Sequence, residues 1–486
     1  MYKNEITNSH EQWLDDRIND LFDFGINSQQ YGGFGYLNSE GKIDKTKNMQ
    51  TYITCRMTHI YSMYALENDF DEQLQDKVKL ARELASHGVK SLINNVQDKK
   101  NKGFYEEIYS YSDRSDSKFA NISEQSSNEC AEYDLKTLPS EGGSRKVAYA
   151  HAFVLLAASS AVCAKIPRAE ELFHNIVDVV NKYFWDDKCQ KTIESYDEDW
   201  SNCEKYRGVN AAMHMTEAFL NTCCAVNAMP AISDINWFQR AESLACFVFD
   251  LARNNSYMIP EHFDENWEPV WDYNVEDKSH QFRPYGATVG HAMEWARLGV
   301  QLVLTHYKHT GEIGDKYLNV LKDCVGLYNV ALQTWGVDGK DGFVYTTDFK
   351  SNPIVRDRMH WVLCEAIGAT IALKQAKSLL KKLSYNVDFM NLKYGVKYIK
   401  NSDYLNVENI SDIKLGFLDV YDYWYRKFIK YADNYLITDD GRWNHQLDFS
   451  NNFSTTIWDG RPDIYHAYQA LWFAKNNNIF LSNDFM

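Results

Sequence analysis

The sequence predicts an all-α fold, an (α/α)6 barrel with short loop hairpins at the mouth of its pocket. Apolar residues recur at the i, i+3, i+4, i+7 spacing of amphipathic helices in about twelve stretches of the chain. Segments rich in glycine and aromatic residues separate alternate stretches. This pattern suits six inner helices around a pocket, covered by six outer helices. An open α-solenoid is the alternative, and the absence of a fixed repeat period disfavours it.

The expected helices follow one another along the whole chain. A clear example begins at Met49, where apolar positions continue through Tyr52, Ile53, Met57 and Ile60. The twelve stretches cover residues 12–22, 49–64, 76–95, 147–164, 168–184, 211–225, 237–253, 290–307, 315–334, 361–376, 416–433 and 463–475. Five segments between them are expected to form loops or small hairpins: YGGFGYL, KGFYEEI, MIPEHFDENW, GFVYTTDFKSNPI and GRWNHQLDFS.

The domain organisation predicted is a single barrel domain over residues 1–486, since no linker divides the chain. Two segments interrupt the helical pattern. Residues 110–143 are rich in Ser, Asp, Glu and Asn and are expected to form a long insertion. Residues 377–412 mix Lys, Asn, Tyr and Leu, and are expected to add a subsidiary helix or hairpin.

The bulk composition excludes several kinds of partner. A net charge of −16 disfavours a nucleic acid or an anionic membrane surface. The longest apolar run, residues 148–164, is too short and polar to span a bilayer, and no secretion signal is visible at the N-terminus. Cysteines within apolar stretches suggest reduced thiols, so we expect a cytoplasmic protein, compatible with a homo-oligomer. Aromatic residues make up 14%, which suits either a large core or stacking against sugars.

Three pairs of a histidine and a carboxylate lie three residues apart at the starts of helical stretches. They are His214/Glu217, His291/Glu294 and Asp463/His466. This spacing places both side chains on one helix face, where a carboxylate can fix the tautomer of an imidazole. Each pair alone is more often structural. Their shared position in alternate helices predicts that they surround one barrel mouth, where general acid–base chemistry is expected.

Other residues extend this candidate site. Arg56 lies on the same helix face as Tyr52 and Ile60, so it either pairs with a buried carboxylate or faces a polar cavity. Trp361 and Glu365, four residues apart, add an aromatic wall and a carboxylate on a further helix. Arg283, in HQFRPYG, has a weaker claim because loop arginines are commonly solvated.

No known cofactor or metal motif accompanies these residues. The chain contains no phosphate-binding glycine loop, nucleophile elbow or zinc-ligand pattern. The His-x-x-Glu spacing could ligate a metal, but di-iron bundles place Glu before His. We therefore expect neither a metal nor a cofactor.

Motifs spread over nearly the whole chain resemble the N-acylglucosamine 2-epimerase superfamily, and within it the branch of mannose isomerase and sulfoquinovose isomerase. The motifs are FDFGINSQQYGGFGYLNSEG, TCRMTHIYS, KVAYAHAFVLLAASSAV, EKYRGVNAAMHMTEAF, ARNNSYMIPEHFDENWEPVWDYN, FRPYGATVGHAMEWARL, DGFVYTTDF and TTIWDGRPDIYH. The resemblance implies an (α/α)6 barrel that carries out metal-free 1,2-proton transfer on a reducing sugar.

The resemblance also implies roles for the residues within these motifs. His466 is expected to carry the proton between C2 and C1, and His291, oriented by Glu294, to assist ring opening. The candidate substrate-binding residues are Tyr52, Arg56, Asn210, His214, Arg283, Trp361, Glu365 and His445.

One departure from the family pattern bears on the substrate. Isomerases of the sulfonated sugar carry two glutamines where this chain has His445 and Pro462. Loss of two amide donors disfavours an anionic substituent at C6, so mannose, with fructose as product, is the expected substrate. The alternatives are a sugar 2-epimerase, a sulfoquinovose isomerase, a glycoside hydrolase and a non-catalytic sugar-binding protein.

Overall fold

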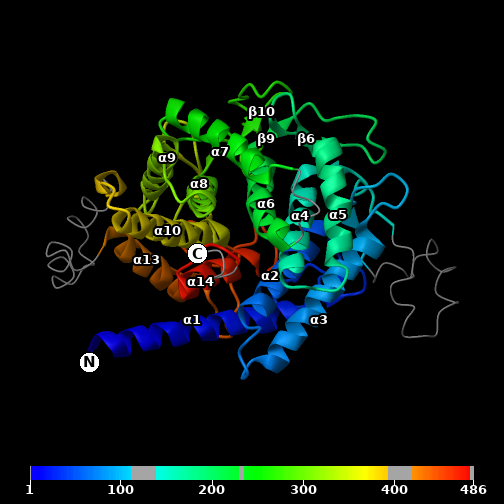
Figure 1. The fold of residues 1–486 in the computed structure, drawn as a ribbon, viewed down its shortest axis with the longest axis horizontal. Coiled ribbons are helices and arrows are strands. Elements are labelled where there is room, and N and C mark those ends of the chain that lie inside the picture. The colour runs from blue at the N-terminus through cyan, green and yellow to red at the C-terminus, as the bar shows by residue number, and fades with distance from the viewer. Residues whose placement is uncertain (1, 111–137, 229–234, 392–418, 482–486) are drawn as a thin grey trace.

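The computed structural model describes residues 2–110, 138–228, 235–391 and 419–481. Helices dominate these residues, which confirms the predicted all-α class. Figure 1 shows an inner set of helices surrounded by an outer set. The inner helices are α2 (Thr51–Glu67), α4 (Ala148–Cys163), α6 (Val209–Ala228), α8 (Val289–Thr310), α10 (His360–Lys382) and α14 (Tyr465–Asn476). The outer helices are α1 (Tyr2–Ile26), α3 (Gln75–Ser91), α5 (Ala169–Val179), α7 (Trp237–Asn254), α9 (Asp315–Leu332) and α13 (Val420–Tyr431).

Contacts between the inner helices run in a closed order. Helix α2 contacts α4, and the series continues through α6, α8, α10 and α14 back to α2. Each inner helix also contacts the outer helix that follows it in sequence, except that α14 contacts α1, so the first and last described helices form one pair (Figure 1). Helices from the first and last parts of the described chain therefore pack together, and α14 closes the ring of contacts by contacting α2.

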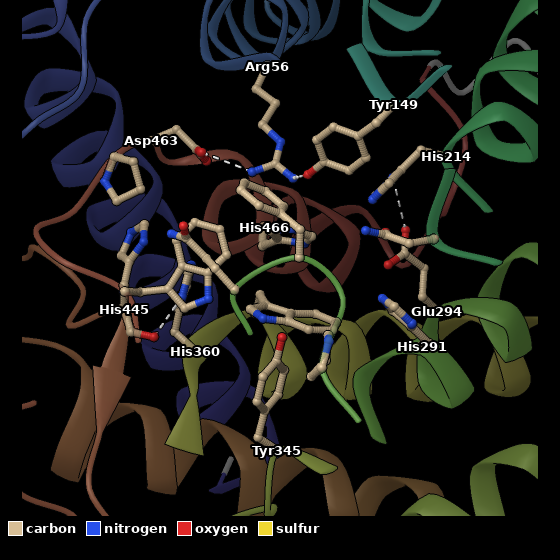
Figure 2. A pocket seen from close by; sticks show the side chains of 17 residues that line it. Arg56, Tyr149, His214, His291, Glu294, Tyr345, His360, His445, Asp463 and His466 are labelled. Carbon is tan, nitrogen blue, oxygen red and sulfur yellow. Dashed lines mark hydrogen bonds and ion pairs between the residues drawn. The ribbon is translucent and has the colours of Figure 1, made fainter. Parts of the chain in front are cut away.

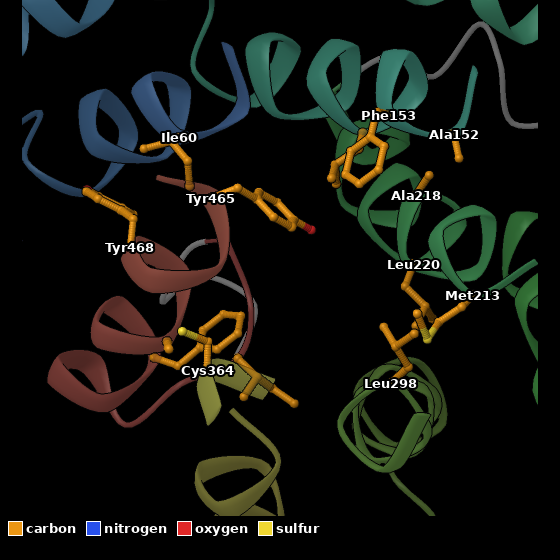
Figure 3. Close-up of a cluster of buried hydrophobic side chains, with 14 of the residues drawn as sticks. Ile60, Ala152, Phe153, Met213, Ala218, Leu220, Leu298, Cys364, Tyr465 and Tyr468 are labelled. Atoms are coloured by element: carbon orange, nitrogen blue, oxygen red, sulfur yellow. The ribbon is translucent and has the colours of Figure 1, made fainter. Parts of the chain in front are cut away.

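The difference between inner and outer helices follows from their side chains. The inner helix α4 is buried on almost every side, and its many alanine and serine residues allow neighbours to approach closely. The outer helix α5 buries only one face. Figure 3 shows part of the apolar core that the inner helices share, which includes Ile60, Phe153, Leu298 and Tyr465.

Three outer helices continue into π-helical turns, namely η1 (Leu92–Val96) after α3, η4 (Val180–Phe184) after α5 and η7 (Ala432–Leu436) after α13.

Short antiparallel strand pairs lie at the starts of five inner helices. These pairs are β3 (Met49–Gln50) with β4 (Glu107–Ile108), β5 (Lys146–Val147) with β8 (Ser195–Tyr196), β9 (Arg207–Gly208) with β10 (His262–Phe263), β11 (Ala287–Thr288) with β12 (Thr346–Thr347), and β14 (Arg358–Met359) with β15 (Gln446–Leu447). Strand β13 (Pro353–Val355) extends the β11–β12 sheet. Two further pairs are β1 (Gln29–Gln30) with β2 (Gly33–Phe34), and β6 (Trp185–Asp186) with β7 (Lys191–Thr192).

One backbone hydrogen bond recurs at the start of each of these five inner helices. The first helical N–H donates to the carbonyl of the residue that precedes the second strand of the pair. In α8, for example, Val289 N donates to Tyr345 O at 3.1 Å, and in α10 His360 N donates to His445 O at 3.0 Å. The bond satisfies one of the N–H groups that a helix start leaves unpaired. The equivalent carbonyls are those of Glu106, Glu194, Glu261, Tyr345 and His445.

Most sequence-based element boundaries agree with the structure. The expected hairpin segments contain β2, β4, β10, β12 and β15, so they do form small strand pairings. The first helix is longer than expected, since α1 spans Tyr2–Ile26 rather than 12–22. The sequence does not predict the N-terminal part of α1, because apolar residues do not recur there at helical spacing.

The two predicted insertions lie partly outside the described residues. Within the first, residues 138–143 pack on β4, where Gly143 O accepts hydrogen bonds from Glu106 N and Glu107 N. The start of the second was placed too early, because residues 377–382 form the last turn of α10. A short 3-10 turn, η6 (Asp388–Met390), follows. Residues 111–137 and 392–412 of the two segments lie outside the described part of the chain.

Among the described residues, no helix is both long enough and apolar enough to cross a membrane.

Gly88 tests how closely α3 packs on α2. A Cβ atom at this position would overlap Thr58 Oγ1, and Thr58 Oγ1 donates to Thr54 O at 2.7 Å. Gly88→Ala is expected to lower the free energy of unfolding by about 1–3 kcal/mol through overpacking. Chemical denaturation measures this change. Gly314→Ala is the matched control, because nothing lies within 4 Å of its added Cβ and the change should stay within about 0.5 kcal/mol.

Candidate active site

A cavity of about 680 Å³ opens where the inner helices begin. Four polar residues of the site, Arg56, His214, Glu294 and Glu365, share one position, five residues after the first residue of α2, α6, α8 and α10. The helical repeat therefore places them at a similar depth. The lining residues are Arg56, Tyr149, Asn210, His214, Gln281, Phe282, Pro284, His291, Glu294, Tyr345, His360, Trp361, His445, Trp458, Pro462, Asp463 and His466 (Figure 2).

His291 is oriented by a carboxylate that the sequence analysis did not identify. Its Nδ1 lies 2.8 Å from Glu261 Oε2, and the other oxygen of Glu261 accepts from Thr288 N at 3.2 Å. Glu261 directly precedes β10, so the strand pairing described above positions it. The expectation that Glu294 orients His291 is wrong: although three residues apart on one helix, the ring turns toward the returning strand.

His466 also has a partner other than its neighbour in sequence. Its Nδ1 lies 2.9 Å from Glu365 Oε1. Burial raises the pKa of Glu365, but Arg297 and His466 outweigh burial and leave this pKa below its ordinary value. The ionised carboxylate accepts the Nδ1 proton, so Nε2 of His466 is the nitrogen that can accept a proton. Burial lowers the pKa of His466 despite the opposing effect of Glu365, which favours the neutral ring.

Asp463, the sequence neighbour of His466, instead holds Arg56. Arg56 Nη1 donates to Asp463 Oδ2 at 3.0 Å, and Nη2 donates to Tyr149 Oη at 3.0 Å, as Figure 2 shows. The guanidinium also lies 5.0 Å from the centre of the Tyr52 ring and 4.6 Å from that of Phe153. Arg56 thus satisfies both expectations from its sequence position, a buried carboxylate partner and a place in the cavity wall.

Trp361 lies next to both histidines. Its ring centre is 5.5 Å from that of His291 and 5.8 Å from that of His466. Gly290 makes this position available, because a Cβ atom on residue 290 would overlap the Trp361 indole. The pocket therefore places one indole near two imidazoles, each held through Nδ1 by a glutamate.

Two carboxylates lie beside His214. Its Nδ1 is 3.6 Å from Glu217 Oε2 and 3.6 Å from Glu294 Oε1. Burial lowers the pKa of His214 to about 4, although Glu217 opposes this. Burial and the charge of Glu365 raise the pKa of Glu294 well above its ordinary value. These shifts favour the neutral ring of His214 and the protonated form of Glu294.

These three side chains are also close enough to share a metal ion, since their donor atoms lie within 4.8 Å of one another. Arg297 Nη2, however, lies 3.3 Å from Glu217 Oε1 and 3.4 Å from Glu294 Oε1. A guanidinium thus already supplies the positive charge at these carboxylates, which fits poorly with a resident cation.

The opposite wall of the cavity comes from α10 and the C-terminal loops. The rings of His360 and His445 stack with their centres 3.8 Å apart (Figure 2). Burial lowers the pKa of His360 to about 3 and that of His445 well below its ordinary value. Pro462 and Trp458 complete this wall. The substitutions noted in the sequence, His445 and Pro462, therefore face the same space as His466.

Two predicted binding residues, Tyr52 and Arg283, lie in a second, adjoining cavity of about 1150 Å³. Tyr149, Asn210 and Phe282 line both cavities. Arg283 donates to both oxygens of Glu204, at 2.9 and 3.2 Å, and lies 3.8 Å above the Tyr206 ring. Arg283 is therefore engaged away from the two histidines.

The sequence also matches proteins of known family. The profile of the N-acylglucosamine 2-epimerase (GlcNAc 2-epimerase) family matches residues 32–121, 132–384 and 416–470. The chain belongs to this family. A D-mannose isomerase of Thermobifida fusca is 34% identical over 473 residues, which cover 95% of this chain and 93% of that protein. A second D-mannose isomerase, from Pseudomonas cannabina pv. alisalensis, is 32% identical over 465 residues, covering 95% and 92%.

Solved structures of the family share the fold. A crystal structure of D-mannose isomerase superposes with a TM-score of 0.70 at 21% identity and covers 96% of this chain and 98% of its own. Cellobiose 2-epimerase of Bacillus thermoamylovorans B4167 superposes with a TM-score of 0.65 at 15% identity, covering 97% and 100%. Membership of the N-acylglucosamine 2-epimerase family and the D-mannose isomerase relatives make this chain an isomerase.

Several residues of the site were missed from the sequence. Glu261 and Tyr345 directly precede short strands in segments that were recognised only as loops. Tyr149 follows the first residue of α4, and is equivalent to Tyr52 in α2. Aligning the helix starts with one another would have revealed that equivalence. Arg297 lies within the quoted GHAMEWARL motif, but nothing in its spacing indicated three carboxylate partners.

Gly290→Ala tests the placement of Trp361. The added methyl group must displace the indole from its position next to the histidines, so kcat/KM should fall by about 10- to 100-fold. Stability should change little, because Trp361 borders the open cavity and alanine favours a helix. Isomerase activity and chemical denaturation measure the two effects. An active variant would show that the indole position is unimportant, and Gly314→Ala serves again as the control.

Proposed function

We propose that the protein is an aldose–ketose isomerase that interconverts a free aldohexose, mannose, with its ketose, fructose. The observation that carries the proposal is the pair His291 and His466, which line one cavity and both lie next to Trp361. Each ring is held through Nδ1 by a glutamate, so each offers Nε2 for proton transfer. The D-mannose isomerase relatives, similar over nearly the whole chain, support the choice of reaction.

The proposal includes the architecture that surrounds this pair. The closed order of contacts among the inner helices, with α14 next to α2, supports an (α/α)6 barrel. Because α1 and α14 come from opposite ends of the chain and pair with each other, we propose that the chain forms one domain. The pocket then lies at the mouth of the barrel, on the side of the strand pairs.

Ring opening is the first step of the proposed reaction. A base removes the proton of the C1 hydroxyl while an acid protonates the ring oxygen, and the bond between C1 and that oxygen breaks. His291 is assigned to this step, with Glu261 holding its orientation. The protonated Glu294 lies near His214 in the same wall and can donate a hydrogen bond to a sugar oxygen.

Proton transfer between carbons follows in the open chain. His466 Nε2 accepts the proton from C2, and the electron pair moves through the C1–C2 bond onto the aldehyde oxygen to give a cis-enediolate. The C2 hydroxyl proton moves to that oxygen, which transfers the negative charge to the oxygen at C2. As the carbonyl forms at C2, the electron pair of the C1–C2 double bond takes the proton back from His466 at C1, which yields the ketose. The lowered pKa of His466 suits the accepting role.

Arg56 supports the negative charge that develops on oxygen. Its guanidinium is buried and held in place by Asp463 and Tyr149, so no reorganisation is needed as the charge forms. Asn210 and His214 offer further polar contacts from α6. The scheme thus assigns the transfer between C2 and C1 to His466 and the stabilisation of the oxyanion to Arg56.

The chemistry of the pocket wall favours an uncharged sugar. His360 and His445 are buried neutral rings, and Pro462 has no side-chain donor. These groups provide little positive charge for a sulfonate. A 2-epimerase remains the second candidate because His291 and His466 could act on opposite faces of the enediolate, and cellobiose 2-epimerases share the fold. The product decides between them.

Mannose incubated with the purified enzyme in D2O is expected to give fructose with deuterium at C1, measured by NMR. His466→Gln should lower kcat by about 10²–10⁴-fold, the usual contribution of general acid–base catalysis. Glu312→Gln, an exposed change, is the control. Glucose as the product would establish epimerisation, and no turnover of any aldohexose or of sulfoquinovose would refute the proposal.

The dependence of kcat/KM on pH tests the role of His466. Its neutral form is the active base and its pKa lies below 6.5, so activity should fall only as the pH drops below that value. Glu365 raises the pKa of His466, so Glu365→Gln should move the acid limb to lower pH while reducing activity. A limb that stays at the same pH in this variant would contradict the assignment.

A further inference from the structure

Arg297 lies beneath the pocket rather than in its wall. It follows Glu294 by three residues on α8, and its side chain is only 1% exposed. It is not among the residues that line the cavity. A sugar in the pocket would therefore not touch this guanidinium, and any effect of Arg297 on the reaction must pass through other side chains.

Three carboxylates from three inner helices surround Arg297. Its Nε donates to Glu365 Oε2 at 2.9 Å, and its Nη2 donates to Glu217 Oε1 at 3.3 Å and Glu294 Oε1 at 3.4 Å. All three glutamates are almost fully buried. One guanidinium therefore contacts three acidic side chains that are buried from water.

Each of these carboxylates lies next to a histidine of the site. Glu365 holds His466 Nδ1 with its other oxygen, at 2.9 Å. Glu217 and Glu294 both lie 3.6 Å from His214 Nδ1. The same guanidinium is therefore one carboxylate away from the proposed base on α14 and from the neutral ring on α6.

The remaining polar groups near Arg297 supply no second cation close to the carboxylates. Tyr465, on α14, donates to Glu217 Oε2 at 2.6 Å. Gln469, also on α14, contacts Glu217 at 3.5 Å and His59 of α2 at 3.3 Å. Burial lowers the pKa of His59 to about 4, and Arg297 adds to this, so the ring is neutral. Arg56, the other charged group of the site, is paired with Asp463.

The charges around Arg297 are unequal. Burial opposes ionisation of Glu217, but Arg297 and His214 outweigh it and hold this pKa below its ordinary value, as with Glu365. Glu294 has the weakest contact with Arg297, and its pKa is raised instead. Around one guanidinium, ionisation is therefore favoured at Glu217 and Glu365 and disfavoured at Glu294.

We propose that Arg297 is a positioning residue that sets the proton affinity of His466 from below the pocket. Through Nε it holds Glu365 oriented behind His466, with the charge of the guanidinium favouring the ionised carboxylate. The proposal rests on the proposed function, because it assigns His466 as the base of that reaction.

Replacing Arg297 should change the pH dependence in a defined direction. Loss of a positive charge makes every neighbouring group easier to protonate, whether the added proton is held by Glu365 or by His466. Either protonation removes the active form of the site, in which His466 is neutral and Glu365 is ionised. Arg297→Met should therefore move the acid limb of kcat/KM upward by about one pH unit or more. KM should change little, since the residue does not line the pocket.

Two further variants separate charge from geometry. Arg297→Lys keeps the charge but cannot reach three carboxylates at once, so its acid limb should stay near that of the wild type while kcat falls about tenfold. The double variant Arg297→Met/Glu217→Gln removes one negative charge as well as the positive charge. Its acid limb should therefore lie between that of Arg297→Met and that of the wild type. Arg358 provides the matched control, because it forms a similarly buried ion pair with Asp338 at 2.7 Å. Arg358→Met and Arg358→Lys should leave the limb and kcat unchanged.

Histidine-selective NMR provides a readout that does not require turnover. The imidazole signal of His466, assigned with His466→Gln, should titrate at a changed pH in Arg297→Met: higher if His466 holds the added proton, and lower if Glu365 holds it and no longer stabilises the imidazolium. An unchanged midpoint in that variant would overturn the proposal even if the enzyme proves inactive on every sugar tested. If Arg297→Met does not fold, Arg297→Lys decides: an unchanged kcat overturns the proposal, and a loss confined to kcat supports it.

Discussion

A backbone hydrogen bond recurs at the starts of five inner helices and fixes the end of the molecule where the first cavity opens. In each case the first N–H of an inner helix donates to the carbonyl of the residue that precedes a returning strand. The bond ties the start of the helix to the loop that comes back from the outer layer, so the two segments cannot move independently. Glu261, Tyr345 and His445 occupy that position, and their side chains either line the first cavity or hold His291.

The second constraint is the buried charge beneath the first cavity. Removing a carboxylate from water is costly, and Arg297 offsets part of this cost by contacting all three, while Tyr465 and Gln469 add donors to Glu217. An apolar core of the same volume would be at least as stable. Arg297 and its glutamates instead provide fixed charges behind the histidines, where water does not screen them.

The sequence was informative about helices and less so about partners. Helical periodicity predicted all twelve α-helices of the described residues, because a long apolar pattern tolerates exceptions at single positions. The residues His291, His466, Arg56 and Trp361 were also predicted correctly to line one cavity. Their partners were not, because a spacing of three residues only permits a contact: His291 pairs with Glu261, thirty positions earlier, and His466 with Glu365, on another helix. The sequence did not show that Arg283 lines an adjoining cavity, because the path of a loop cannot be read from periodicity.

The pairing of α14 with α1 has a consequence for how the enzyme is made. Helix α14, which carries His466, is the last helix of the described chain, while its outer partner is the first. A growing polypeptide on the ribosome therefore cannot complete the ring until its C-terminal helix has emerged, and the imidazole of His466 reaches Glu365 only at that point. Contacts this distant in sequence close slowly. The site would then become complete only when α14 packs against α1 and α2, late in synthesis. A chain truncated before residue 465 would leave the apolar faces of α1 and α2 exposed.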